Sequence, residues 1–173
     1  MQTITPNLMF KKDAEKAVEL YVSVFSSVLG NSKIIKTTYY GKEELLALKE
    51  VPGMTEDIMP GPVGSIKTIR LQLNGQEFVA VNGGAYFGNF SESMSLYVSC
   101  ETQSQIDRLW KELSKDGVEQ PCGWLKDKYG VSWQIAPAII EKIMEGPDQN
   151  RSQRVMKALY GMKKIDVETL KHA

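Results

Sequence analysis

Residues 117–137 read GVEQPCGWLKDKYGVSWQIAP, and this stretch decides the fold. It holds two of the three tryptophans and a cysteine, and two short runs of strand-forming residues flank one turn. Aromatic and β-branched residues bounded by glycine and proline are typical of strands, so the stretch predicts a β-hairpin. The second strand ends in Ser-Trp-Gln-Ile, and its amide residue, Gln134, is a weak ligand for a metal ion.

The sequence predicts the same order of secondary-structure elements twice along the chain, and the hairpin ends the second copy. The first copy has a strand over residues 3–10, a helix over 13–25, and strands over 32–40, 65–73 and 76–82. The apolar residues of the helix share one face, and Asp13 is its expected N-cap. Asn74-Gly75 between two apolar runs predicts that the last two strands form a hairpin. The first copy is therefore βαβββ.

The second copy has the same order. It comprises a strand over 94–100, a helix over 103–115 with Thr102 as its cap, and strands near Val118, over 123–126 and over 131–136. Helices are predicted beyond it, over 139–144 and 152–162, with Pro147 and Asp148 opening the second. An internal repeat of this size predicts an α+β chain. Its parts are one domain over 1–137, built from modules at about 1–84 and 92–137, and a helical extension over 138–173.

Composition excludes several classes of protein. Lysine plus arginine equals aspartate plus glutamate at 21 each, and no basic block is present, so a nucleic-acid partner is not expected. No apolar run reaches the length of about 18 residues that a membrane span needs, and no secretory signal is present, so we expect a cytoplasmic protein with no membrane partner. The two cysteines, Cys100 and Cys122, have no CxxC spacing and are expected to be reduced thiols.

The paired modules carry a family resemblance. The motifs ITPNLMF, AEKAVELYVSVF, LNGQEFVAVNGG, QPCGWLKDKYGVSWQIAP and RSQRVMKALYGMKKID resemble the vicinal oxygen chelate superfamily of glyoxalases, bleomycin-resistance proteins and extradiol dioxygenases. Within it they resemble the PhnB-like branch labelled demethylubiquinone methyltransferase-like. The resemblance implies that the modules form an open, cup-shaped sheet, that the cup holds a divalent metal or a hydrophobic ligand, and that the protein is a homodimer.

In this sequence, weak ligands occupy the metal-binding positions that the resemblance implies. They fall near Thr5, at Ser93, at Gln134 and between residues 79 and 82. Hydroxyls and amides bind first-row metals weakly compared with imidazole, thiolate or carboxylate, and the one histidine is His172. We therefore predict no metal and no cofactor. Methyl transfer is not expected either, because Asn82-Gly83-Gly84 leads into a loop composition rather than into the helix of a cofactor-binding βαβ unit.

Strand alternation predicts which side chains line the cup. Thr5 and Asn7 share one strand face, Ser93 and Tyr97 share another, and Arg70 alternates with apolar neighbours. The full set of predicted ligand-binding residues is Thr5, Asn7, Arg70, Asn82, Ser93, Tyr97, Trp124 and Gln134. Simpler interpretations stay open for three of these residues: Arg70 as a solvated strand charge, Trp124 as core, and Gln134 as a structural amide.

Two further features bear on function. Cys122 is a weak catalytic candidate, since no activating base is visible and a free cysteine is usually a small buried hydrophobe. Residues 41–64, with Met54 and Met59, interrupt the first copy and are predicted to be a lid or a dimer arm.

Three functional hypotheses follow. The first is a metal-free homodimer that binds a small molecule in its cup. The second is an enzyme of the same superfamily that acts on a small metabolite through polar contacts or Cys122, with at most a weakly held metal. The third is a regulatory protein that uses the helices over 152–170 to bind another protein.

Overall fold

The structure is a computed structural model that describes residues 4–173. The start of the predicted first strand, at Thr3, lies outside the described residues. The chain divides into two compact units, Met1–Asn89 and Phe90–Ala173. Each unit contains one four-stranded sheet, and each is described by itself below.

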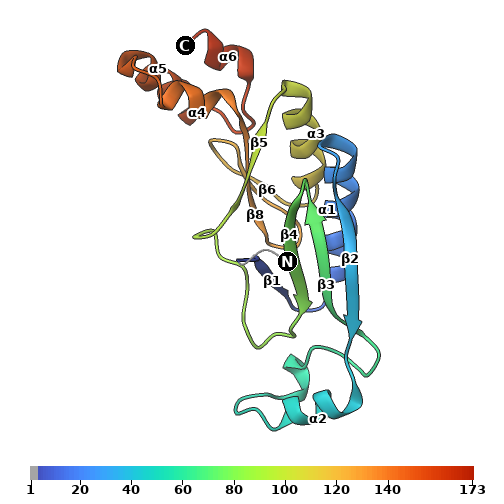
Figure 1. Ribbon diagram of the computed structural model, residues 1–173. Helices are drawn as coiled ribbons and strands as arrows, with labels where there is room; N and C mark the ends of the chain where they lie inside the picture. The colour runs from blue at the N-terminus through green and yellow to red at the C-terminus, as the bar shows by residue number, and fades with distance from the viewer. Residues whose placement is uncertain (1–3) are drawn as a thin grey trace. The chain divides into compact units, whose positions relative to one another are not determined.

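The first unit realises the predicted βαβββ order. Its elements are β1 (Asn7–Phe10), α1 (Ala14–Val28), β2 (Lys33–Tyr39), α2 (Lys42–Lys49), the 3-10 helix η1 (Glu56–Ile58), β3 (Ile66–Leu73) and β4 (Gln76–Asn82). The strand order is β1-β4-β3-β2, in which β1 pairs with β4 in parallel and the other pairs are antiparallel. Helix α1 covers one face of this sheet (Figure 1) and buries Val18, Tyr21 and Phe25 there.

The hairpin predicted from Asn74-Gly75 is confirmed. The two residues join β3 to β4 with φ values of 46° and 89°. Two successive left-handed residues make the type I′ turn, whose twist matches that of the flanking strands. The sequence therefore sets the register of this hairpin locally.

The N-terminus of α1 is capped in an unexpected way. Asp13 lies at the N-cap position, as predicted, but its side chain makes no capping hydrogen bond and pairs with Lys16 at 2.9 Å. The backbone N–H of Ala14 instead donates to Oδ1 of Asn82, 68 residues away, at 2.9 Å. The prediction of Asp13 as the capping side chain was wrong because a buried amide at the end of β4 satisfies the helix end.

Residues 41–64 are more structured than the predicted arm. They contain α2 and η1, and Leu45 of α2 is buried. The backbone N–H of Ala85 donates to the carbonyl of Ile58, and a side chain at Gly84 would collide with that same carbonyl oxygen. The insertion is therefore packed against the segment that follows β4.

The second unit repeats the topology. Its elements are β5 (Leu96–Cys100), α3 (Gln103–Leu113), β6 (Val118–Glu119), β7 (Trp124–Lys126), β8 (Ser132–Pro137), α4 (Ile139–Met144), α5 (Gln149–Tyr160) and α6 (Val167–Lys171). The strand order β5-β8-β7-β6 matches that of the first sheet element for element, including one parallel pair. The predicted α+β class of paired βαβββ modules is confirmed.

The local predictions in this unit are confirmed. Thr102 caps α3 as predicted, in a capping box with Gln105, and Asp148 caps α5 by accepting from the N–H of Arg151. The strands predicted near Val118, over 123–126 and over 131–136 are confirmed as β6, β7 and β8. Strands β7 and β8 form the predicted antiparallel hairpin, and the two-residue strand β6 pairs with the other edge of β7.

The helical extension packs in an apolar cluster with the end of β8. The cluster comprises Ala136 of β8 and Ile143, Val155, Leu159, Ile165 and Leu170 of the extension. The N–H groups of Cys122 and Gly123 donate to the carbonyls of Met162 and Lys163 at 2.7 and 2.8 Å, so the extension is tied to the turn before β7. Among residues 4–173, no helix is long and apolar enough to cross a membrane.

Candidate functional site

Each sheet has one face against its helix and one face turned away from it. In the first unit Asn7 and Arg70 both lie opposite Val79 in the pairing register, so they share the face away from α1. The burial pattern of β3, in which Ile69 and Leu71 are buried and Arg70 is half-buried, agrees with this assignment. The structure therefore brings Asn7 and Arg70 onto one face, as the strand alternation predicted.

The chemistry of that face is ionic. The guanidinium of Arg70 donates to Oε2 of Glu77 at 2.9 Å, and both side chains are partly buried. Lys36 lies opposite Arg70 on β2. An arginine with a carboxylate partner already in place is less suited to capture an anionic ligand, which supports the simpler interpretation of Arg70 as a strand charge.

Two other predicted residues of this unit behave differently. Thr5 precedes β1 and is half-buried. Asn82 is 4% exposed and lies on the α1 side: its Oδ1 caps α1, and its Nδ2 donates to Glu15 and to the carbonyl of Ile66. These contacts use the side-chain amide of Asn82 to hold α1 against the sheet. The predicted ligand-binding role of Asn82 does not fit this position.

In the second unit the predicted residues form a continuous row. Gln134 on β8 lies opposite Tyr97 of β5 on one side and Trp124 of β7 on the other. The neighbouring pair Leu125 and Trp133 is buried on the α3 side. The pleat therefore places Tyr97, Gln134 and Trp124 on the face away from α3. We call these three residues the aromatic row.

The row is accessible and is held by polar contacts. Tyr97 is 47% exposed, and Trp124 and Gln134 are half-buried. Nε2 of Gln134 donates to Oγ of Ser95 at 2.7 Å, which leaves its Oε1 as a hydrogen-bond acceptor. Ser93, predicted beside Tyr97, is exposed in the loop before β5 and shares a hydrogen bond with Ser91, so the structure does not place it in the row.

Glu141 of α4 adds a carboxylate beside this row, and sequence reasoning missed it. Partial burial raises the pKa of Tyr97, and the charge of Glu141 together with a hydrogen bond to it raises that pKa further. The tyrosine is therefore a hydroxyl donor at neutral pH rather than a phenolate. Its contact with Glu141 spans 44 residues of sequence, so no local pattern could reveal it.

A buried carboxylate supports the strands that carry the row. Asp127 is 3% exposed and accepts hydrogen bonds from the N–H groups of Tyr129 and Val131 and from the indole N–H of Trp133. These bonds close the turn between β7 and β8. The spacing Asp127-x-x-Gly130 is typical of a side-chain-closed turn and could have identified this residue in the sequence.

The two cysteines have different surroundings. Cys122 is half-buried with φ +62°, and it packs against the apolar cluster of the helical extension. This environment fits the interpretation of a small hydrophobe better than that of a nucleophile. Burial, and to a smaller extent the charge of Glu101, raises the pKa of Cys100 to about 12, so this thiol is not ionised at neutral pH.

The residues present do not fit the divalent metal of the superfamily. Within residues 4–173 no group of three or more His, Cys, Asp or Glu side chains could hold a metal ion. Of the implied ligand positions, Asn82 is committed to α1 and Gln134 offers one neutral amide oxygen. Neutral amide and hydroxyl oxygens form a poor donor set for a tight first-row metal site.

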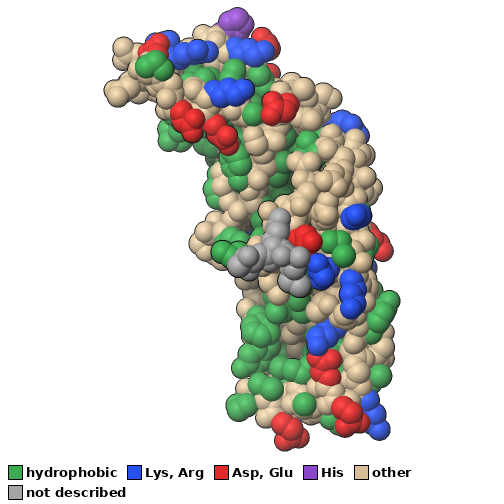
Figure 2. Space-filling view, viewed as in Figure 1, with side chains coloured by type: hydrophobic (Ala, Val, Ile, Leu, Met, Phe, Trp, Pro, Cys, Tyr) green, Lys and Arg blue, Asp and Glu red, His purple; other side chains and the backbone are tan. Residues whose placement is uncertain are grey.

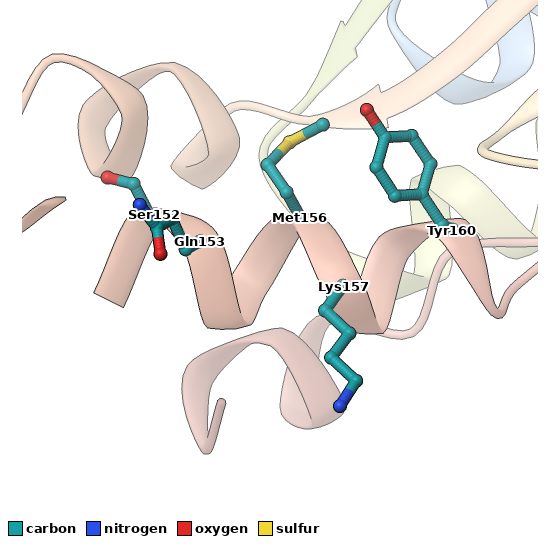
Figure 3. Close-up of a pocket in the computed structure, with 5 residues that line it drawn as sticks. All are labelled: Ser152, Gln153, Met156, Lys157 and Tyr160. Atoms are coloured by element: carbon teal, nitrogen blue, oxygen red, sulfur yellow. The ribbon is translucent and has the colours of Figure 1, made fainter. Parts of the chain in front are cut away.

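A separate hollow lies along α5. It has a volume of about 390 Å³ and is lined by Ser152, Gln153, Met156, Lys157 and Tyr160. The side chains of Met156 and Tyr160 extend from the same side of the helix (Figure 3), as their spacing of four residues requires. Ser152 donates to the carbonyl of Ile143, so its hydroxyl serves the helix packing.

Two βαβββ modules with the same strand order are the architecture of a glyoxalase-like protein. A sequence model of one family matches residues 2–136, and that family is described as 3-demethylubiquinone-9 3-methyltransferase. The chain belongs to this PhnB-like family. No curated protein matches the chain.

Solved structures agree with this assignment. A Bacillus cereus protein described as a putative 3-demethylubiquinone-9 3-methyltransferase, PhnB protein, is 34% identical, with a TM-score of 0.62, and the match covers 79% of this chain and 100% of that chain. Protein PA1353 from Pseudomonas aeruginosa is 17% identical with a TM-score of 0.56, covering 79% of this chain and 98% of that one, and supports the fold alone.

The methyltransferase description finds no support in the site. Gly83 and Gly84 follow β4, but the next residues form a turn and an irregular segment that leads to β5. A dinucleotide- or adenosylmethionine-type site needs a glycine-rich turn that opens a helix, so that backbone N–H groups and the helix dipole meet the cofactor. The family description therefore identifies related sequences and is not evidence that this protein transfers a methyl group.

Proposed function

We propose that this protein binds a small, flat molecule on the aromatic row of its second unit. The main support is that Tyr97, Gln134 and Trp124 lie side by side across three hydrogen-bonded strands. Two aromatic side chains flank one amide, and a planar ligand can contact the rings while it donates a hydrogen bond to Oε1 of Gln134. Binding requires no metal.

Two predictions from the sequence belong to this proposal. We propose that the protein is a homodimer, as the resemblance implies, and that it acts in the cytoplasm. Native mass spectrometry of the freshly purified protein, combined with elemental analysis of the same sample, reports subunit number, metal content and any co-purified organic molecule together. A stoichiometric divalent metal would overturn the metal-free part of the proposal, and a monomer would overturn the dimer.

A matched pair of probes tests the binding mode. We expect 2-naphthol to bind more tightly than naphthalene by about fivefold to tenfold, because only the hydroxyl can donate to Gln134, and a net hydrogen bond is worth about 1 kcal/mol. Tryptophan fluorescence quenching measures both affinities. In Gln134→Ala the difference between the two probes should disappear, while Gln72→Ala, an amide variant in the first unit, should keep it.

Loss of binding in Trp124→Leu with retained circular dichroism would support stacking on the row. Equal affinity of the two probes for the unaltered protein would refute the assigned hydrogen bond. Failure of both probes to bind up to their solubility limits would refute the aromatic row as a platform for flat ligands.

An enzyme remains the second candidate because of one contact. Glu141 lies beside Tyr97 and raises its pKa, and a carboxylate so placed can act as a general base that takes a proton from a bound molecule through the tyrosine hydroxyl. If the protein turns over a ligand found by mass spectrometry, Tyr97→Phe should lower kcat with little change in KM. Cys122→Ala should leave turnover unchanged, and a loss of turnover in that variant would return Cys122 to the catalytic candidates.

A further inference from the structure

A second hollow lies in the insertion of the first unit, far in sequence from the aromatic row. It has a volume of about 550 Å³, within the range of about 300–1,000 Å³ that is usual for small-molecule sites. Its lining residues are Lys42, Leu45, Leu46, Lys49, Glu56, Met59, Gly61, Pro62 and Val63. We call it the α2 hollow, because the four residues of α2 in this set recur at positions i, i+3, i+4 and i+7 and so form one face of that helix.

The walls of the α2 hollow are apolar and partly exposed. Leu45 is buried at its base, whereas Leu46 and Val63 are 48% and 59% exposed. Figure 2 shows hydrophobic side chains gathered on the surface over the segment that contains α2. Covering such side chains with the apolar part of a ligand is favourable, because it removes their apolar surface from water.

The rim of the hollow carries a surplus of positive charge. Lys49 pairs with Glu56 at 2.9 Å, so these two charges neutralise one another. Lys42 has no acidic partner among the described residues, although Glu44 of the same helix turn is occupied by an ion pair with Lys67. One unmatched ammonium group at the edge of an apolar hollow favours a ligand with one negative charge and an apolar body.

The opposite wall is held in place before any ligand arrives. The N–H of Ser65 and its hydroxyl both donate to the carbonyl of Pro62, and the N–H of Gly64 donates to the carbonyl of Tyr40. These bonds fix the turn that presents Val63. A preformed wall lowers the entropy cost of binding, because fewer groups must be ordered on association.

We propose that the α2 hollow binds a small amphipathic carboxylate, such as a medium-chain fatty acid. The chain would lie between the apolar face of α2 and the turn at Pro62-Val63, and the carboxylate would meet Lys42. This site shares no residue with the aromatic row, and its ligand class differs, so the two sites can be tested independently.

The test uses the full-length protein with ¹³C-methyl-labelled methionine and decanoate as the probe, kept below its micelle concentration. The methyl signal of Met59, assigned with Met59→Leu, should shift with saturation, because Met59 lines the hollow. The signal of Met156, which lines the hollow on α5, serves as the internal control and should stay unchanged. Decanol, which has the same chain without the charge, should bind about fivefold more weakly.

Variants separate the charge from the apolar walls. Lys42→Gln should weaken decanoate by about fivefold and leave decanol unaffected, Lys42→Arg should restore decanoate binding, and the exposed strand variant Lys33→Gln should match the unaltered protein. Leu46→Asp should weaken both probes. An unchanged Met59 signal, equal shifts at Met59 and Met156, or equal affinities for decanoate and decanol in the unaltered protein would each overturn the proposal.

Discussion

Removal of the carboxylate of Asp127 is the sharpest perturbation that the structure offers. This side chain is 3% exposed and accepts three hydrogen bonds at 2.9–3.0 Å, from the N–H groups of Tyr129 and Val131 and from the indole of Trp133. Asp127→Ala leaves these donors without an acceptor, and each buried unsatisfied donor costs about 1–3 kcal/mol. Two of the three bonds are buried, so we expect a loss of about 2–6 kcal/mol in the free energy of unfolding of the second unit.

Asp127→Asn isolates the hydrogen bond between Asp127 and the indole of Trp133. An asparagine keeps one acceptor oxygen for the two backbone N–H groups but presents its NH₂ to the indole N–H of Trp133, donor against donor. We expect a loss of about 1–3 kcal/mol for this variant, smaller than for alanine. In a Trp133→Phe background the indole N–H is absent, so most of the penalty of Asp127→Asn should vanish, which appears as a coupling energy in a double-mutant cycle.

Urea unfolding followed by tryptophan fluorescence measures these losses. All three tryptophans, Trp110, Trp124 and Trp133, lie in the second unit, so the probe reports that unit. Glu112→Ala, an exposed change on α3, serves as the control and should stay within about 0.5 kcal/mol of the unaltered protein. If Asp127→Ala shifts the transition no more than this control, the carboxylate does not support the turn and the reasoning is refuted.

Three other predictions follow from the remaining contacts. Asn82→Ala should lower the stability of the first unit by about 1–3 kcal/mol, measured by circular dichroism, because the amide caps α1 from inside the core. Cys122 should react with a thiol reagent in the native protein at pH 8, whereas Cys100, whose pKa burial raises to about 12, should react only on unfolding. The hydrogen bond from Lys164, and after it the one from Gln103, lowers the pKa of Asp107. The small stability that the Asp107–Lys164 pair contributes is therefore present above the unfolded pKa of Asp107 and is lost as pH falls through its folded pKa. Lys164→Gln should raise the Asp107 pKa, as measured in an NMR titration.

The elements that the sequence predicts well are those with local causes. The turn at Asn74-Gly75 and the cap at Thr102 depend on residues within a few positions of one another, and both are confirmed. Helix α2 was missed because it has eight residues and one buried side chain, Leu45, so its apolar periodicity is short. Local chemistry can thus be read from sequence, whereas a short helix needs its packing to be recognised.

The site residues show what sequence alone does not predict, namely contacts between residues that are far apart in the chain. Strand alternation put Tyr97 on a candidate face, the family resemblance singled out Gln134, and the pairing register places the two residues side by side. The resemblance implied a ligand position at the end of β4, and Asn82 was assigned to a ligand there, because an amide at a strand end gives no sign of whether its partner is a ligand or a helix 68 residues earlier. Glu141 was missed for the same reason, since its contact with Tyr97 depends on how α4 packs.

The two modules share a topology but present different chemistry on their helix-free faces, and this difference supports the proposal that the ligand binds to the second unit. The first face carries the Arg70–Glu77 ion pair, with Lys36 opposite Arg70, and charged groups of this kind prefer water to a planar apolar ligand. The second face carries Tyr97 and Trp124 around one amide, which bury apolar area and keep a polar handle. The repeat gives both units the same strand order, so the side chains on each face, and not the fold, determine which unit is suited to a planar ligand. If the aromatic row were scaffold alone, Trp124→Leu would cost stability and leave the 2-naphthol affinity unchanged, and the opposite pattern is the one we expect.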